Sequence, residues 1–345
     1  MEATLRRVYW ETTAGCNLRC IHCRRVDALW RPSPDELTTA EGKGLIDQLA
    51  SAGKPVLIFS GGEPLSRKDF FTLASYARNL GLPIALATNG TLVTEALAQQ
   101  LRETGIYYAS VSLDGATPAT HDRFRGKDNF ARVLKGFWNL KQAGIKVQIN
   151  YTVTKDNVGE VPKMYELAQA FGAHALYLFL LVPVGCGVQI ADSHILSTEQ
   201  VEEWLKWVVQ TDQKGSLPIK AICAPQYYRV EAAMLDGNSA AVKAPGDRKG
   251  CLAGIHMCFI SHKGEVYPCG YLPSVCGDVR KVPFKEIWGK SEVFQELRDP
   301  ELLKGKCGLC PIKAVCGGCR ARGYYAYQDL LAEEPFCAFE PQAAH

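Results

Sequence analysis

The chain has 345 residues, of which 47% are hydrophobic, 22% charged and 10% aromatic. This composition is typical of a soluble globular protein and excludes a disordered, collagenous or coiled-coil chain, and at roughly 150 residues per domain the length predicts one large domain and a smaller one. The net charge is only +3 and the basic residues form no long run, which argues against nucleic acid and anionic membranes as partners.

The apolar segments are too short for a membrane anchor. Residues 1–15 contain no apolar targeting core, and the longest nearly pure apolar run, 175–184, is far shorter than the ~18 residues of a spanning helix. We therefore expect a cytoplasmic protein with no membrane association. In that reducing compartment, fourteen clustered cysteines indicate metal binding rather than a disulfide framework.

Six short apolar segments predict strands. The first is expected at 7–13, and each of the others follows an amphipathic segment that ends in Gly: 54–59, 82–87, 106–113, 145–153 and 173–182. Glycine commonly ends a helix, so the pattern predicts helices between the strands. This alternation is typical of the α/β class, with a parallel sheet covered by helices.

Two pairs of residues predict helix starts, and one segment predicts a linker. Thr38 with Glu41, and Ser197 with Gln200, have the spacing of a capping box, in which each member satisfies the other's free backbone N–H. Residues 236–250 are rich in Gly, Ala and Pro and poor in large apolar side chains. We therefore expect one domain over 1–235 and a second over 236–345 that includes this linker.

Three cysteines, Cys16, Cys20 and Cys23, follow the first predicted strand. A [4Fe–4S] cluster ordinarily takes four thiolates, so three cysteines would leave one iron open to another ligand. The alternative is a zinc site completed by His22 or by a distant cysteine. Structural zinc sites favour paired C-x2-C spacing, and we therefore favour the cluster.

Polar residues follow the other predicted strands. The glycines after the second strand allow a ligand to approach the backbone, and the neighbouring carboxylate suits an ammonium group. Because the carboxyl ends of parallel strands converge, we expect one shared site there, although each residue alone could be a turn or cap residue. Its members would be Gly61, Gly62, Glu63, Pro64, Asn89, Ser112, Asp114 and Asn150.

The last hundred residues hold the densest cysteine pattern. Without context, the two C-x2-C pairs at Cys307, Cys310, Cys316 and Cys319 would predict a zinc knuckle. Four further cysteines flank them: Cys251, Cys258, Cys269 and Cys337. Three more, Cys186, Cys223 and Cys276, have no predicted role beyond that of core or substrate-proximal thiols.

At Cys16, Cys20 and Cys23 the sequence resembles the radical S-adenosylmethionine (SAM) enzymes, whose C-x3-C-x2-C signature follows the first strand of a partial (β/α)6 TIM-like barrel. The resemblance implies a [4Fe–4S] cluster whose open iron binds SAM. An electron from a donor such as ferredoxin or flavodoxin then cleaves SAM to methionine and a 5′-deoxyadenosyl radical. No catalytic side chain beyond the cluster and SAM is implied.

The strand-end residues match the SAM site of this family. The resemblance implies that the GGEP segment, Gly61 to Pro64, holds the methionyl amine of SAM. Ser112, Asp114 and Asn150 would lie near the ribose and the methionyl carboxylate, and Asn89 belongs to the same predicted site.

The C-terminal cysteines resemble the SPASM extension of radical SAM enzymes, a cysteine-rich iron–sulfur domain. This resemblance implies one or two auxiliary [4Fe–4S] clusters, and two are favoured. Cys251, Cys258, Cys269 and Cys319 would hold the first, and Cys307, Cys310, Cys316 and Cys337 the second. The interval before Cys319 contains two residues, Gly317 and Gly318, where the family usually has three.

Longer stretches, such as SLDGATPATHDRFRG at 112–126 and CFISHKGEVYPCGYL at 258–272, resemble one group of these enzymes. That group acts in the siroheme-dependent pathway and oxidatively decarboxylates iron-coproporphyrin III to haem b. A tetrapyrrole substrate with four carboxylates would need guanidinium partners. The candidates beside the motifs are Arg24, Arg25, Arg123, Arg125, Arg320 and Arg322.

Three alternatives remain open from the sequence. The chain could act on a related tetrapyrrole, as a didecarboxysiroheme deacetylase or as the enzyme of the d-type haem precursor. It could instead modify a peptide, although no leader-peptide recognition domain precedes Cys16. It could also be a non-catalytic zinc protein, which iron and sulfide content would distinguish.

Overall fold

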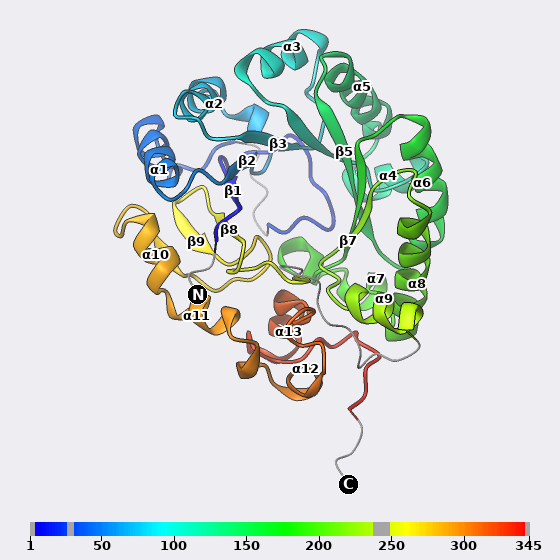
Figure 1. Ribbon diagram of the computed structural model, residues 1–345. Helices are drawn as coiled ribbons and strands as arrows, with labels where there is room; N and C mark the ends of the chain where they lie inside the picture. The colour runs from blue at the N-terminus through cyan, green and yellow to red at the C-terminus, as the bar shows by residue number, and fades with distance from the viewer. Residues whose placement is uncertain (1–3, 26–30, 237–248, 342–345) are drawn as a thin grey trace.

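The computed structural model describes residues 4–25, 31–236 and 249–341. These residues form a ten-stranded sheet with the order β10-β9-β8-β1-β2-β3-β4-β5-β6-β7. Neighbouring strands from β8 to β7 pair in parallel, and β9 pairs antiparallel with both β8 and β10. The parallel strands curve into an incomplete barrel with the helices outside it (Figure 1).

The six predicted strands are confirmed as β1 to β6. Four more strands, β7 to β10, were not predicted. The strands are β1 (Arg7–Glu11), β2 (Val56–Ser60), β3 (Ile84–Thr88), β4 (Tyr108–Ser112), β5 (Lys146–Val153), β6 (Ala175–Leu180), β7 (Ile219–Ile222), β8 (Met257–Ile260), β9 (Glu265–Tyr267) and β10 (Gly277–Asp278).

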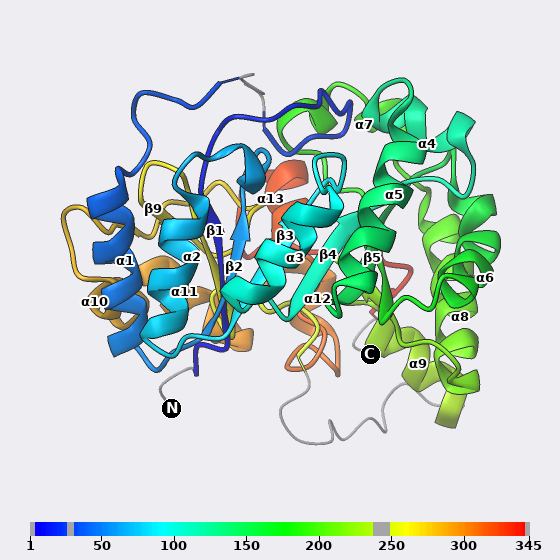
Figure 2. The ribbon, with the colours of Figure 1, turned by 90° about the horizontal axis from the view of Figure 1, so that it is seen from above.

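Helices follow most of the parallel strands and cover the outside of the barrel (Figure 2). Both predicted capping boxes are present, at Thr38 and at Ser197. The helices are α1 (Thr39–Ser51), α2 (Phe70–Asn79), α3 (Glu95–Thr104), α4 (Pro118–Arg125), α5 (Asn129–Gln142), α6 (Val161–Ala170), α7 (Ala191–His194), α8 (Thr198–Lys214), α9 (Tyr227–Asp236), α10 (Phe284–Lys290), α11 (Glu292–Arg298), α12 (Gly305–Leu309) and α13 (Arg320–Tyr327), with 3-10 turns η1 (Pro64–Ser66), η2 (Val158–Glu160), η3 (Gly185–Val188) and η5 (Pro300–Leu302).

The two faces of the sheet differ in burial. Along β4, Ala109 and Val111 are buried in the main core beneath the helices, whereas Tyr108, Ser110 and Ser112 are only partly buried. Successive residues of a strand point to opposite faces, so the latter three lie on the inner face of the barrel. The apolar core therefore lies between sheet and helices, and the inner face is left accessible.

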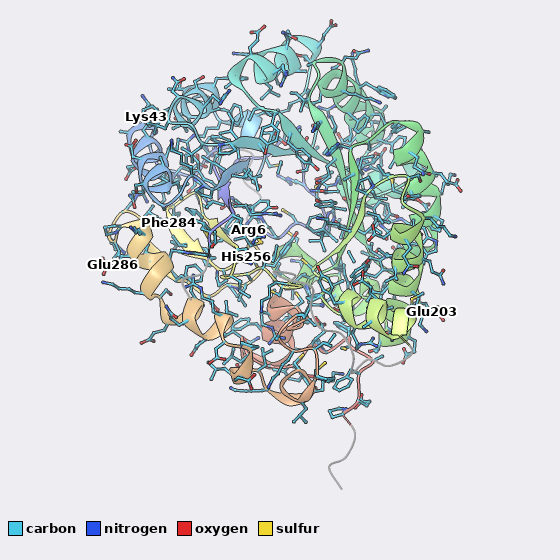
Figure 3. All side chains as sticks on the ribbon, viewed as in Figure 1. Arg6, Lys43, Glu203, His256, Phe284 and Glu286 are labelled. Atoms are coloured by element: carbon cyan, nitrogen blue, oxygen red, sulfur yellow. The ribbon has the colours of Figure 1, made fainter. Side chains whose placement is uncertain are left out.

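The C-terminal segment is continuous with the barrel. Strand β8 pairs in parallel with β1, and the backbone N–H of Phe284 on α10 donates to the Gln48 side chain of α1 at 2.7 Å. On α10, Phe284 points inward and is fully buried, while Glu286 points outward (Figure 3). Most of the predicted linker, 237–248, lies outside the described residues, and the domain boundary near 235 stays a prediction.

Across the three described ranges, no helix is both long and apolar enough to cross a membrane.

Candidate active site

The cysteine loop, defined as residues 12–25, crosses the carboxyl ends of the strands (Figure 2). Asn17 receives a hydrogen bond from Asn89 at the end of β3, at 2.8 Å. Further along the loop, the backbone N–H of Ile21 donates to Phe124 O of α4 at 3.0 Å, and Cys23 O accepts from the N–H of Cys186 in η3 at 2.8 Å. These contacts hold the loop over the barrel mouth.

Hydrogen-bond donors surround the sulfur atoms of this loop. The N–H of Leu18 lies 3.4 Å from Cys16 Sγ, and Arg125 Nη1 lies 3.8 Å from Cys20 Sγ. Burial raises the pKa of Cys20 to about 12, so a metal must displace its proton. Donors aimed at sulfur stabilise iron-bound thiolates, and the loop therefore fits an iron–sulfur cluster.

The GGEP segment packs directly against the cysteine loop. The N–H groups of Gly62 and Glu63 donate to Thr13 O and Gly15 O, each at 2.8 Å. A Cβ atom added at Gly62 would lie 2.2 Å from Gly15 O, so only glycine fits at this position. Gly61 and Gly62 stay partly exposed, which leaves their backbone accessible to a ligand.

Glu63 itself is fully buried. Its carboxylate accepts hydrogen bonds from Thr88 Oγ1 and from the N–H of Asn89, both at 2.8 Å. Burial raises the pKa of Glu63 to about 7, although these hydrogen-bond donors act to lower it. The carboxylate thus fixes the GGEP segment to the end of β3, and its contact with an ammonium group stays a prediction.

Asp114 joins the cysteine loop to α4. It is fully buried, forms an ion pair with Arg125, and lies 3.3 Å from His22 Nε2. Burial alone would raise the pKa of Asp114, but Arg125 and His22 hold it well below its usual value. Asp114 is therefore a charged anchor of the site, and its predicted place beside the SAM ribose or carboxylate stays a prediction.

The other predicted strand-end residues face the barrel interior. Ser112 and Asn150 are register partners on β4 and β5, and both are partly exposed on the inner face. Asn89 is buried and accepts a hydrogen bond from the N–H of Thr91 at 2.9 Å. Ser112 and Asn150 are therefore better placed than Asn89 to contact a ligand.

An aromatic group on the inner face was missed in the sequence. Tyr9, Tyr108 and Tyr177, from β1, β4 and β6, interact with one another across the barrel, and Phe179 lies on the same face. On β3 the inner-face position opposite Ser110 is the small residue Ala87. The signal was present as period-2 alternation in each strand, but the pairing register is needed to see that these rings share one face of the barrel.

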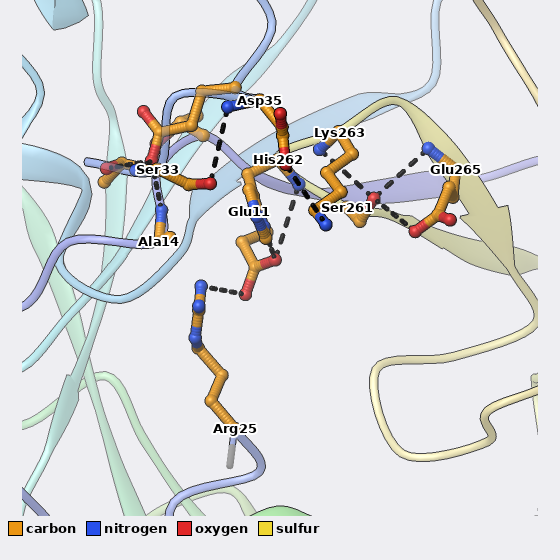
Figure 4. Close-up of polar contacts among 12 residues, drawn as sticks. Glu11, Ala14, Arg25, Ser33, Asp35, Ser261, His262, Lys263 and Glu265 are labelled. Atoms are coloured by element: carbon orange, nitrogen blue, oxygen red, sulfur yellow. Dashed lines mark hydrogen bonds and ion pairs between the residues drawn. The ribbon is translucent and has the colours of Figure 1, made fainter. Parts of the chain in front are cut away.

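A buried ion cluster lies at the end of β1 (Figure 4). Glu11, at the end of β1, accepts a hydrogen bond from Arg24 at 2.7 Å and pairs with His262 Nδ1 at 2.7 Å and Arg25 Nη1 at 3.2 Å. Burial opposes its charge, yet Arg24 and His262 lower the pKa of Glu11 to about 2. The cluster ties the cysteine loop to the turn after β8.

Most of the arginines that were candidates for binding substrate carboxylates form ion pairs with carboxylates of the protein itself. Arg24 and Arg25 bind Glu11, and Arg125 binds Asp114. Arg320 and Arg322 are buried, Arg320 donating to Ala332 O and Arg322 pairing with Glu334, and a contact of either with a substrate stays a prediction. Arg123 is exposed and pairs with Asp156 at 3.3 Å.

Four C-terminal cysteines line one cavity beside α12. Cys307, Cys310, Cys316 and Cys337 all line this one small cavity of about 20 Å³. The N–H of Glu334 lies 3.3 Å from Cys307 Sγ, and Arg320 Nη2 lies 3.8 Å from the same atom. The structure thus brings these four cysteines together, and their role as ligands of a second auxiliary cluster stays a prediction.

The cysteines predicted for the first auxiliary cluster do not all converge. Cys251, Cys269 and Cys319 interact with one another, whereas Cys258 interacts with Cys276 in the main core. Across the described ranges, no group of three or more His, Cys, Asp or Glu side chains is close enough to hold a single metal ion. A [4Fe–4S] cluster binds each thiolate through a different iron and so requires wider sulfur spacing.

Comparisons with known proteins agree with this geometry. Residues 10–168 match the model of the Radical SAM superfamily, and residues 251–319 match SPASM, described as an iron–sulfur cluster-binding domain. An "AdoMet-dependent heme synthase" of Methanosarcina barkeri is 48% identical over 97% of this chain and 97% of that protein. The chain belongs to the radical SAM enzymes with a SPASM domain.

Two more relatives are similar to this radical SAM enzyme over nearly its whole length. An "AdoMet-dependent heme synthase" of Oleidesulfovibrio alaskensis is 44% identical over 98% of this chain and 88% of that protein. An "Fe-coproporphyrin III synthase" of Methanosarcina barkeri is 34% identical over 96% and 87%, respectively. Family membership implies SAM and a [4Fe–4S] cluster, and the SPASM domain implies auxiliary iron–sulfur centres.

Solved structures share the fold. SuiB of Streptococcus suis superposes with a TM-score of 0.75 at 15% identity, over 98% of this chain and 76% of that chain. The anSMEcpe structure with bound AdoMet gives a TM-score of 0.72 at 22% identity, over 96% and 94%. At these identities the similarity concerns the radical SAM and SPASM architecture alone.

Proposed function

We propose that this radical SAM enzyme forms haem b by oxidative decarboxylation of two propionates of iron-coproporphyrin III to vinyl groups. The main support is the 48% identity, over nearly the full length of both chains, to a protein named heme synthase. Relatives named for other tetrapyrrole reactions, Fe-coproporphyrin III synthase and pre-heme d1 synthase, are 34% identical. This difference favours haem formation over the related activities.

The carboxyl ends of the strands form the SAM end of the proposed site. Cys16, Cys20 and Cys23 would bind three irons of the cluster, which together with SAM supplies a 5′-deoxyadenosyl radical. The exposed backbone at Gly61 and Gly62, with Ser112 and Asn150, would contact SAM. Glu63 and Asp114, which are buried and fully engaged, would act as positioning residues.

The inner face would hold the macrocycle. Tyr9, Tyr108, Tyr177 and Phe179 offer rings for stacking against a flat conjugated substrate, and Ala87 leaves room opposite them. In each round, a hydrogen atom leaves the β-carbon of one propionate, CO2 is lost, and one electron must be removed to form the vinyl group. Two propionates therefore require two molecules of SAM.

The electron acceptor would be the first auxiliary centre. Cys269 interacts with Tyr271, and Tyr271 interacts with Tyr9 on the inner face. Tyr271 is close enough to both Cys269 and Tyr9 for their charges to affect it, and this proximity supports an acceptor beside the proposed substrate site. We further propose that the electron for SAM cleavage comes from a small redox protein such as ferredoxin or flavodoxin.

Product mass tests this function. The reconstituted enzyme is incubated anaerobically with SAM, a reductant and iron-coproporphyrin III, and the porphyrins are analysed by mass spectrometry. We expect successive losses of CO2 plus two hydrogens, first to a monovinyl and then to a divinyl product. A Cys20→Ala variant should form neither 5′-deoxyadenosine nor haem, whereas Cys276→Ala should form both.

Other outcomes would favour other members of the family. Conversion of a different tetrapyrrole with no change to iron-coproporphyrin III would contradict the proposed substrate. Efficient modification of a peptide, with no porphyrin product, would favour a maturase, as in the "Mycofactocin maturase MftC" of Mycobacterium tuberculosis that is 31% identical.

A further inference from the structure

We infer that Cys223, and not Cys258, completes the ligand set of the first auxiliary cluster together with Cys251, Cys269 and Cys319. The inference rests on the auxiliary cluster that the proposed function requires. It assigns a metal ligand that the sequence pattern did not indicate, and it leaves Cys258 as a core residue.

Cys223 lies with the other ligand candidates. It directly follows β7, and its side chain packs with Cys269 against a small apolar cluster of Val182, Leu272, Ala321 and Cys319. The thiols of Cys223 and Cys319 are within hydrogen-bonding reach of each other, and Cys223 also interacts with Cys269. Three elements remote in sequence thus bring their cysteines to one place beside the barrel.

The remaining cysteine, Cys251, belongs to the same group. It interacts with Cys319 and Cys269, and backbone N–H groups of Ala253 and Arg320 are directed at its sulfur. Cys269 receives backbone N–H groups from Tyr271 and Leu272 in the same way. Such donors are the usual environment of cluster thiolates, whose potentials they tune.

Cys258 lies on the other side of the sheet. It occupies β8 in register with Val8 of β1, and both residues are fully buried in the main core between sheet and helices. The next residue, Phe259, is the register partner of Tyr9, which lies on the inner face. Because neighbouring strand residues point to opposite faces, the Cys258 thiol is separated from the cysteine group by the sheet itself.

The backbone at Cys223 supports a constrained role. Its φ angle is +55°, in the left-handed region that a side chain other than Gly, Asn or Asp seldom adopts. A residue in this conformation is strained and persists where the surrounding structure requires it. Here the conformation ends β7 and places the thiol beside Cys319.

A buried arginine beside these cysteines would balance the negative charge of four thiolates. Arg322 is completely buried. It donates hydrogen bonds to Glu334 through Nε and Nη2, each at 2.9 Å, and its charge interacts with Cys319 and Cys223. Its remaining Nη1 is buried and has no hydrogen-bond partner among the described residues. Four cluster thiolates would provide negatively charged acceptors near this nitrogen.

Two single variants separate the assignments. Cys223→Ala and Cys258→Ala are reconstituted anaerobically beside the wild type, and iron, acid-labile sulfide and the electron paramagnetic resonance spectra are measured. With three clusters per chain, we expect Cys223→Ala to lose up to about a third of the iron or to show a new [3Fe–4S] signal when oxidised. Cys258→Ala should keep the wild-type iron content and spectra.

Controls keep the test decisive. Circular dichroism checks the fold, and Cys258→Val replaces the thiol with apolar volume if the alanine variant is unstable. Loss of iron from folded Cys258 variants, or unchanged iron and spectra in Cys223→Ala, would overturn the assignment. A wild-type enzyme that shows the expected contrast between variants but makes no haem would contradict the proposed function and leave the ligand assignment intact.

Discussion

At the scale of single residues, Asp114 connects the parts of the SAM end. It pairs with Arg125 of α4, lies 3.3 Å from His22 in the cysteine loop, and accepts the N–H of Thr152 on β5 at 2.6 Å. One carboxylate therefore fixes three elements around the proposed cluster. Its loss would leave Arg125 as an uncompensated charge in a largely buried position.

We expect Asp114→Asn to lower the free energy of unfolding by about 3–5 kcal/mol, because one partner of a buried ion pair is removed. Chemical denaturation of anaerobic protein measures this change. The matched control is Asp156→Asn, whose partner Arg123 has 64% of its side chain exposed, and its effect should stay below about 1 kcal/mol. Equal effects of the two substitutions would contradict the anchoring role of Asp114.

Glu11 provides a prediction with a defined pH dependence. Its pKa in the folded protein is about 2, below the roughly 4.3 of an unfolded Glu, so its contribution is complete above the unfolded value and is lost as pH falls toward 2. We expect Glu11→Gln to cost on the order of 3 kcal/mol. Unfolding measurements at pH 6, 7 and 8 should give the same cost, and a cost that falls steadily across this range would refute the assignment.

At the scale of elements, the inner face of β3 is notable for its small side chains. Ala87 pairs in register with Ser110 of β4 and is partly exposed toward the interior. Bulky rings come instead from β1, β4 and β6. The space for a flat substrate is therefore set by which strands carry small residues.

We expect Ala87→Phe to block the macrocycle while leaving SAM cleavage measurable, because the added ring would fill the inner face below the SAM end. Haem formation should fall at least tenfold, and 5′-deoxyadenosine should still form without product. Ala233→Phe is the control, since Ala233 is exposed on α9. Normal haem yield from Ala87→Phe would place the substrate elsewhere.

Some strands could be predicted from the sequence and others could not. Strands β1 to β6 were predictable because local signals, apolar runs and glycine helix ends, define them. Strands β7 and β8 have four residues each and no periodicity, so they were missed. The position of Cys258 in the main core could not be predicted for the same reason, because only the pairing of β8 with β1 decides which face its thiol occupies.

At the scale of the whole molecule, the cysteine groups occupy different parts of the fold. The cysteine loop covers the barrel mouth, the group containing Cys269 lies near Tyr271, and the cavity lined by Cys337 lies beside α12. Radical formation needs only the first of these. Vinyl formation also needs an electron acceptor.

We expect Cys319→Ala to leave SAM cleavage measurable but to lower the vinyl product formed per SAM cleaved, because the first auxiliary centre, the proposed electron acceptor, is damaged while the cysteine loop is intact. The ratio of porphyrin product to 5′-deoxyadenosine measures this coupling, with Cys276→Ala as control. A proportional fall of both quantities would mean that this centre is structural or supplies electrons to the SAM end.

The parallel pairing of β1 with β8 has a consequence for biosynthesis. The ribosome makes Arg7–Glu11 first, yet its neighbour Met257–Ile260 appears about 250 residues later, roughly 12 to 50 seconds at ordinary elongation rates. During that interval one edge of the nascent sheet has unpaired backbone groups, which are a template for aggregation. A chain that terminates before β8 would keep this edge permanently, so premature truncation should yield insoluble protein rather than a smaller active enzyme.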